Sequence, residues 1–142
     1  MRIVKRFFPL FLAFIFFVAR GFAGPANAPQ TNQDVRVIEV TAKKYEFNPS
    51  PIHVKQGTKV QLKITPLDRK HGFKISLYPD GAEAKGDPGL VFSSSEDCFE
   101  ISEGAPAVVE FVARTSGTYS FKCCKHCGLG HGGMKGQLIV EP

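Results

Sequence analysis

The sequence predicts an all-β fold, a Greek-key β-sandwich, for the chain that follows residue 34. Apolar and polar residues alternate there in several short runs, which is the period-two pattern of strands with one buried face. Turn-forming residues separate these runs at intervals of about ten residues. No segment of this region sustains a helical period. Short strands at this spacing are typical of two-layer sandwiches with Greek-key connections.

Seven runs are expected to be strands, and the segments between them to be turns or loops. The strands are centred on residues 35–37, 52–54, 60–64, 73–77, 109–113, 119–123 and 138–140. A turn at 55–58 joins the second and third strands, and a His71-Gly72 bend precedes the fourth. The prolines of segment 45–51 restrict it to a bend with edge or loop geometry. Segment 79–97 is longer than an ordinary connection, so we expect a functional or mobile loop.

The N-terminus has the pattern of a secretory signal peptide. Basic residues precede an apolar stretch, 7–19, whose length of about thirteen residues falls short of the roughly twenty that span a bilayer. Cleavage after Ala23 is expected, and cleavage after Ala28 or an uncleaved membrane anchor are the alternatives. The expected parts are therefore a signal peptide, a flexible linker and one folded domain: 1–23, 24–34 and 35–142. This organisation predicts a periplasmic or other extracytoplasmic location.

The charge of the chain gives little support for a nucleic-acid partner. The sequence holds 18 lysines and arginines against 13 aspartates and glutamates. Four of the 18 basic residues lie in the predicted signal peptide, so the 14 that remain nearly balance the 13 acidic ones. Scattered lysines on a near-neutral domain do not make the basic patch that nucleic acids require. We expect membrane contact only through an uncleaved signal or a membrane-bound partner.

Residues 123–134 gather side chains that bind soft metals. This segment holds three of the four cysteines, two of the four histidines and the only methionine besides the first residue. Thiolate and thioether ligands, together with imidazole, favour copper. The composition of this segment therefore predicts a copper site.

The spacing of these residues refines the prediction. Cys127, His131 and Met134 would suffice for a mononuclear blue-copper site if one more histidine joined them. His71 follows the 60–64 strand and is the candidate for that ligand. Cys123 lies four residues before Cys127 and adds a second thiolate to the loop.

The pattern Cys-x3-Cys-x3-His-x2-Met, continued as Met-Lys-Gly-x-Leu-x-Val, resembles the binuclear copper-A domain of cytochrome c oxidase subunit II and of nitrous oxide reductase. The resemblance covers roughly residues 35–142 and implies a cupredoxin fold that holds two copper ions. The implied ligands are the bridging thiolates Cys123 and Cys127, then His71 and Met134 on one copper, then His131 and the backbone carbonyl of Lys125 on the other. Lys125 stands where oxidase subunit II has glutamate, and the chain has no tryptophan to offer to cytochrome c.

Several of these residues have a second interpretation. Cys123 and Cys127 could form a disulfide, or two corners of a zinc site with a histidine of the loop, either His126 or His131. Met134 could be a core side chain, as methionines often are. His71 could be an ordinary polar loop residue.

The other two cysteines could form a disulfide. Successive strand residues face opposite ways, so if Cys123 faces the ligands, Cys124 faces away from them. Cys98 is then an available partner for Cys124 in an oxidising compartment. Two free thiols that capture extra metal are the alternative.

We therefore expect an exported, cupredoxin-like electron carrier that catalyses no bond chemistry. Its partners would be redox proteins such as a c-type cytochrome or an oxidase. The alternatives are a mononuclear blue-copper carrier, a periplasmic copper chaperone or storage protein, and an accessory subunit of a respiratory oxidase.

Overall fold

The computed structural model describes residues 34–142, and for His131 it describes the backbone only. The predicted signal peptide and nearly all of the predicted linker lie outside these residues. The described strands are β1 (Arg36–Lys43), β2 (Glu46–Asn48), β3 (Ile52–Lys55), β4 (Lys59–Pro66), β5 (His71–Ile75), β6 (Leu90–Phe92), β7 (Phe99–Ile101), β8 (Ala107–Ala113), β9 (Gly117–Lys122) and β10 (Lys135–Glu141), with a 3-10 helix η1 (His131–Gly133) before β10.

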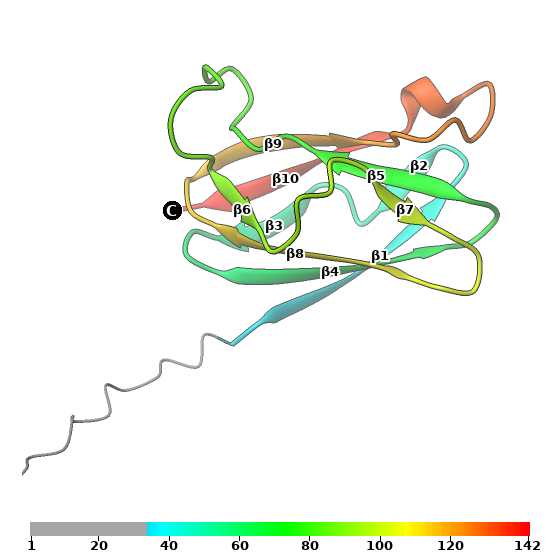
Figure 1. Cartoon of the computed structure of the whole chain (residues 1–142), viewed down its shortest axis with the longest axis horizontal. Coiled ribbons are helices and arrows are strands. Elements are labelled where there is room, and N and C mark those ends of the chain that lie inside the picture. The colour runs from blue at the N-terminus through cyan, green and yellow to red at the C-terminus, as the bar shows by residue number, and fades with distance from the viewer. Residues whose placement is uncertain (1–33) are drawn as a thin grey trace, which may run out of the picture. The chain divides into compact units, whose positions relative to one another are not determined.

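The strands form two five-stranded sheets, which confirms the predicted all-β sandwich (Figure 1). The strand order is β2-β1-β4-β8-β6 in the first sheet and β3-β10-β9-β5-β7 in the second. β1 runs parallel to β4, and β3 runs parallel to β10, while the other paired neighbours are antiparallel. Within residues 34–142, no helix is long and apolar enough to cross a bilayer.

The core lies between the sheets because alternate residues of each strand face inward. In β4, Val60, Leu62 and Ile64 are fully buried, while Gln61 and Lys63 between them keep partial access to solvent. From the second sheet, Phe73 and Phe121 meet with ring centroids 5.2 Å apart. Burying one such side chain contributes about 1.5–3 kcal/mol to folding. The period-two pattern that predicted the strands is therefore the pattern that fills the core.

The expected bend at His71-Gly72 was wrong, because these two residues begin β5 and pair with Ile101 and Glu100 of β7. Gly72 is needed for space rather than for a turn: a Cβ at this position would lie 2.7 Å from Cys124 Sγ. The expected strand also ended too late. β5 stops at Ile75, and the backbone carbonyl of Leu77 accepts hydrogen bonds from the amides of residues 89 and 90, at the start of β6 in the other sheet.

Two of the predicted irregular segments contain short strands. Segment 79–97 was expected to be a loop throughout, but its residues 90–92 form β6 and extend the first sheet by pairing with β8. Segment 45–51 contains β2, which lies at the edge of the first sheet, as its prolines allow. Both strands have only three residues, which is too short for an alternating pattern to stand out in the sequence.

Candidate metal centre

Three neighbouring strands of the second sheet carry the predicted ligands to one end of the sandwich. His71 is the first residue of β5, Cys123 follows the last residue of β9, and Met134 precedes β10. The loop between β9 and β10 projects from this end (Figure 1). The Cys123 amide donates a hydrogen bond of 2.9 Å to the Met134 carbonyl, which continues the β9–β10 ladder into the site. The sheet itself therefore sets the separation of these two residues.

The side chains of His71, Cys123, Cys127 and Met134 converge in the interior. One ligand atom from His71 and the two cysteine Sγ atoms all lie within 4.8 Å of one another. The two Sγ atoms are 3.4 Å apart, and Met134 Sδ lies 3.9 Å from Cys127 Sγ. The Lys125 carbonyl oxygen lies 3.1 Å from Cys123 Sγ. His71 and Met134 are 0% exposed and each cysteine is 4% exposed, so solvent is nearly excluded from the cluster.

The His71 ring tests whether this cluster fits a metal. Its Nε2 lies 2.7 Å from the Asp68 carboxylate, which holds that nitrogen as the N–H donor. Its Nδ1 is buried and has no hydrogen-bond partner among residues 34–142. An unpaired buried nitrogen is costly, by about 1–3 kcal/mol, so it requires an explanation. A basic imidazole nitrogen beside two thiols and a thioether is a copper donor set, and the residues fit the metal.

Asp68 is charged and accepts three hydrogen bonds. Burial on its own would raise the pKa of this carboxyl, but the hydrogen bonds from the His71 ring and from the Lys44 and Arg69 amides lower it below its ordinary value. A charged acceptor on one ring nitrogen fixes the tautomer and orientation of the ring. The sequence analysis missed Asp68, although its position three residues before a candidate ligand was a usable signal.

The Cys127 thiol is held in its protonated form when no metal is bound. Burial, with a further contribution from the hydrogen bond to Cys123, raises the pKa of the Cys127 thiol to about 11. Because the metal ligand is the thiolate, metal binding must release a proton from this residue at neutral pH.

Two residues from distant parts of the chain support the ligand loop. Arg69 Nη1 donates a hydrogen bond of 3.2 Å to the Cys127 carbonyl. The Tyr45 ring packs against Gly130 so closely that a Cβ there would lie 2.4–2.6 Å from three ring atoms. Nothing in the sequence pattern singled out Arg69 or Tyr45, because these contacts join residues 58 or more positions apart.

β7 connects the strand that carries His71 with the ligand loop between β9 and β10. It pairs with β5, and the neighbouring Cys98 forms a disulfide with Cys124 of the ligand loop, with a Cα–Cα distance of 6.0 Å. Glu100 of β7 also contacts Lys70 at 2.8 Å and Lys125 at 3.6 Å. The Cys98–Cys124 disulfide that strand alternation suggested is thereby confirmed, and Cys124 is half-buried whereas Cys123 is buried.

The remaining predicted residues have different outcomes. Cys123 and Cys127 are free thiols in the structure, not a disulfide. His131 begins η1, but its side chain lies outside the described part, so its ligand role stays a prediction. His126 is exposed within the ligand loop. His53 lies on β3, where its Nδ1 is 2.9 Å from a Glu141 carboxylate oxygen.

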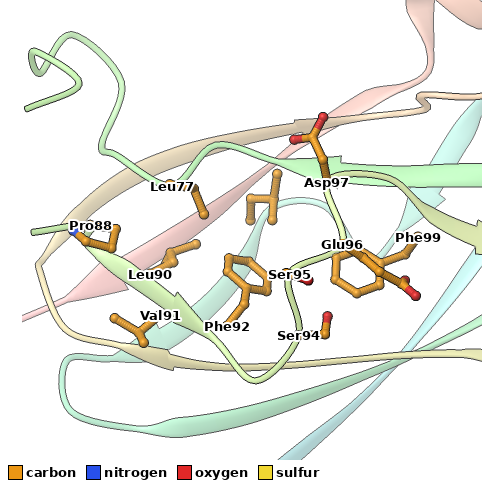
Figure 2. A pocket seen from close by; sticks show the side chains of 11 residues that line it. Leu77, Pro88, Leu90, Val91, Phe92, Ser94, Ser95, Glu96, Asp97 and Phe99 are labelled. Carbon is orange, nitrogen blue, oxygen red and sulfur yellow. The ribbon is translucent and has the colours of Figure 1, made fainter.

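A separate hollow of about 330 Å³ lies beside segment 79–97. Figure 2 shows Leu77, Leu90, Phe92 and Phe99 around it. None of the predicted copper ligands lines this hollow. It is therefore distinct from the metal centre.

Comparison with known proteins identifies relatives of the whole domain. Residues 10–140 match the model of the cupredoxin-like domain family. Cytochrome c oxidase subunit 2 of Thermus thermophilus is 30% identical over 121 residues, which are 84% of this chain and 77% of the relative. In a second subunit 2 sequence from the same species, the chain spans 62% of the relative's length at the same identity.

Two solved structures share the fold. The periplasmic domain of subunit II of cytochrome oxidase from Bradyrhizobium japonicum aligns with a TM-score of 0.56 at 16% identity, over 74% of this chain and 83% of that one. Auracyanin A, a "blue" copper protein of Chloroflexus aurantiacus, aligns with a TM-score of 0.53 at 18% identity, over 75% of this chain and 99% of that one. At these identities the likeness concerns the sandwich alone.

Proposed function

The chain belongs to the cupredoxin family and is related to the soluble domain of cytochrome c oxidase subunit II, and from this premise we propose that it transfers electrons through a binuclear copper centre. The observation that carries the proposal is the pair of buried free thiols, Cys123 and Cys127, with Sγ atoms 3.4 Å apart. A mononuclear blue-copper site uses one thiolate. The second thiol has a role if both sulfurs are shared by two metal ions.

The proposed ligands divide between two ions as the copper-A pattern implies. The full set is Cys123 and Cys127 shared, His71 and Met134 for one ion, and His131 with the Lys125 carbonyl for the other. Copper bound there would supply one-electron redox chemistry. The chain contributes a nearly dry and preorganised site, because His71, Cys123 and Met134 lie at the ends of paired strands, which fix their backbone positions. Asp68 holds the imidazole of His71 in one orientation through its hydrogen bond to Nε2.

The proposed setting is extracytoplasmic, with the protein exported by the predicted signal peptide. The proposed partners are a c-type cytochrome or an oxidase, since the relatives in Thermus thermophilus are cytochrome c oxidase subunits. In this setting the protein carries electrons between partners and catalyses no bond chemistry of its own.

Copper content and electron paramagnetic resonance of the copper-loaded domain test the proposal. We expect about two coppers per chain and hyperfine structure from two equivalent nuclei. The Cys123→Ser variant should fall to one copper, whereas His126→Ala, a change in the same loop at a residue outside the proposed ligand set, should keep two. An unchanged copper count in Cys123→Ser would refute the binuclear centre. A one-copper spectrum in the wild type would identify a mononuclear site of the auracyanin kind.

A further inference from the structure

The outer face of the second sheet carries three lysines side by side, although the sequence suggested only scattered lysines. Lys122 of β9 pairs in register with Lys74 of β5 on one side and with Lys135 of β10 on the other. All three alternate with inward residues, and Lys122 and Lys135 are exposed. We propose that this lysine row is the docking surface for a redox-partner protein whose own docking face is acidic. The inference rests on the proposed electron-transfer function and names the kind of partner.

The row is unfavourable for folding, which points to a functional reason for it. Like charges on directly opposed strand residues destabilise a sheet. Lys74 is partly neutralised by Asp97, with 2.5 Å between Nζ and the carboxylate. Lys122 and Lys135 form no ion pair within residues 34–142. Two unpaired positive charges therefore remain on neighbouring strands, and an acidic partner would relieve their repulsion.

The surface beside the row is hollowed. One hollow, of about 500 Å³, is lined by Lys74, Lys122, Asp97 and the Cys98–Cys124 disulfide, and a second, of about 400 Å³, is lined by the three lysines of the row together with Asp80. None of the exposed large apolar side chains of the described domain lines either hollow. The lining holds three lysines against two aspartates, so this surface keeps a net positive charge. Such a surface, with no exposed large apolar side chain to insert, fits an acidic protein better than a lipid bilayer.

The row also adjoins the metal centre. Lys122 immediately precedes Cys123, and Lys135 immediately follows Met134. Cys123 itself lines the larger of the two hollows. A protein docked on the row would therefore approach one of the proposed bridging sulfurs, which gives the electron a short path.

A lysine-rich cytochrome c and its fully succinylated form are matched probes, because they share a fold and a haem but differ in surface charge. We expect the copper-loaded protein to react faster with the acidic, succinylated form at low ionic strength, and this advantage to disappear as salt is added. Lys122→Gln/Lys135→Gln should lower the second-order rate constant with the acidic form about threefold or more. Lys55→Gln/Lys59→Gln should not, since the β3–β4 turn lies at the end of the sandwich opposite the ligand loop (Figure 1).

A binding measurement on the metal-free protein makes the test independent of electron transfer. Titration with succinylated cytochrome c, followed by nitrogen-15 NMR, should shift the amides of Lys74, Lys122 and Lys135 and leave those of the β3–β4 turn in place. Failure of the copper-loaded protein to be reversibly reduced by ascorbate would refute the proposed function while this titration still decided the docking surface.

Three outcomes would overturn the docking proposal. One is faster reaction with the unmodified, lysine-rich cytochrome. Another is equal rates for the lysine-row and control variants. The third is binding to vesicles of phosphatidylglycerol and phosphatidylcholine in equal parts that is lost in Lys122→Gln/Lys135→Gln, which would assign the row to a lipid surface.

Discussion

Removing the Cys98–Cys124 disulfide should lower the free energy of unfolding by about 3.5 kcal/mol at 25 °C, the value that the chain-entropy model gives for a closed loop of this length. The two cysteines are 26 residues apart in the sequence. The loop they close contains β7, β8 and β9, and β8 and β9 are paired with neighbouring strands on both sides. The sheets hold these strands with or without the disulfide, so its main effect should be the entropy that it removes from the unfolded chain.

The measurement is urea unfolding of the metal-free domain in a Cys123→Ser/Cys127→Ser background, where Cys98 and Cys124 are the only remaining cysteines. Adding Cys98→Ala/Cys124→Ala should lower the midpoint by about 1–3.5 M, given a slope of about 1–3 kcal/mol per molar urea. Reducing the disulfide of the parent background with dithiothreitol is the matched control. It should lower the midpoint by nearly the same amount without changing any side chain.

A loss of less than about 1 kcal/mol in both the variant and the reduced parent, with an unchanged slope, would refute the reasoning. The disulfide would then place no measurable constraint on the unfolded chain. A large loss in the variant alone would assign the effect to side-chain packing around the two sulfurs.

Two further predictions concern groups that support the ligands. Gly130→Ala should weaken copper binding about tenfold or more, because the new Cβ would overlap the Tyr45 ring and displace the loop, while Gly132→Ala, whose Cβ meets nothing within 4 Å, should not. Asp68→Ala should weaken copper binding about ten- to a hundredfold by releasing the imidazole ligand from its fixed orientation. Competition with a copper chelator measures the copper affinity of each variant. Equal affinities for the two glycine variants would contradict the first prediction. Equal affinities for Asp68→Ala and the exposed control Asp87→Ala would contradict the second.

The sequence was sufficient for the longer strands because burial of alternate residues repeats over several positions. Leu62 of β4 and Phe121 of β9 each lie in such a row, and both rows were predicted. The strands β2, β6 and β7 have three residues each and contain no more than two inward positions. So short an alternation of apolar and polar residues cannot be distinguished from a chance arrangement. Their place in the fold depends on pairing with a neighbour, and pairing is not visible along the chain.

The candidate site shows the same division between local and distant signals. Cys123, Cys127 and Met134 lie within twelve residues, so their chemistry and spacing could be recognised together. The Cys98–Cys124 disulfide could be proposed from strand alternation, but its geometry came only from the structure. Contacts such as that of Tyr45 with the loop join segments far apart in sequence, and no periodicity predicts them.

The ligand positions follow from the core rather than being added to it. His71 lies two residues before Phe73 in β5, and Cys123 lies two residues after Phe121, so both occupy the next inward position of a row that is otherwise hydrophobic. At such positions an apolar side chain would favour folding, whereas a buried imidazole with an unpaired Nδ1 opposes it. Residues that violate the local rule in one cluster mark a functional site. A metal ion bound to Nδ1 would remove this cost of burial. The same group that opposes folding of the metal-free chain would therefore favour copper binding.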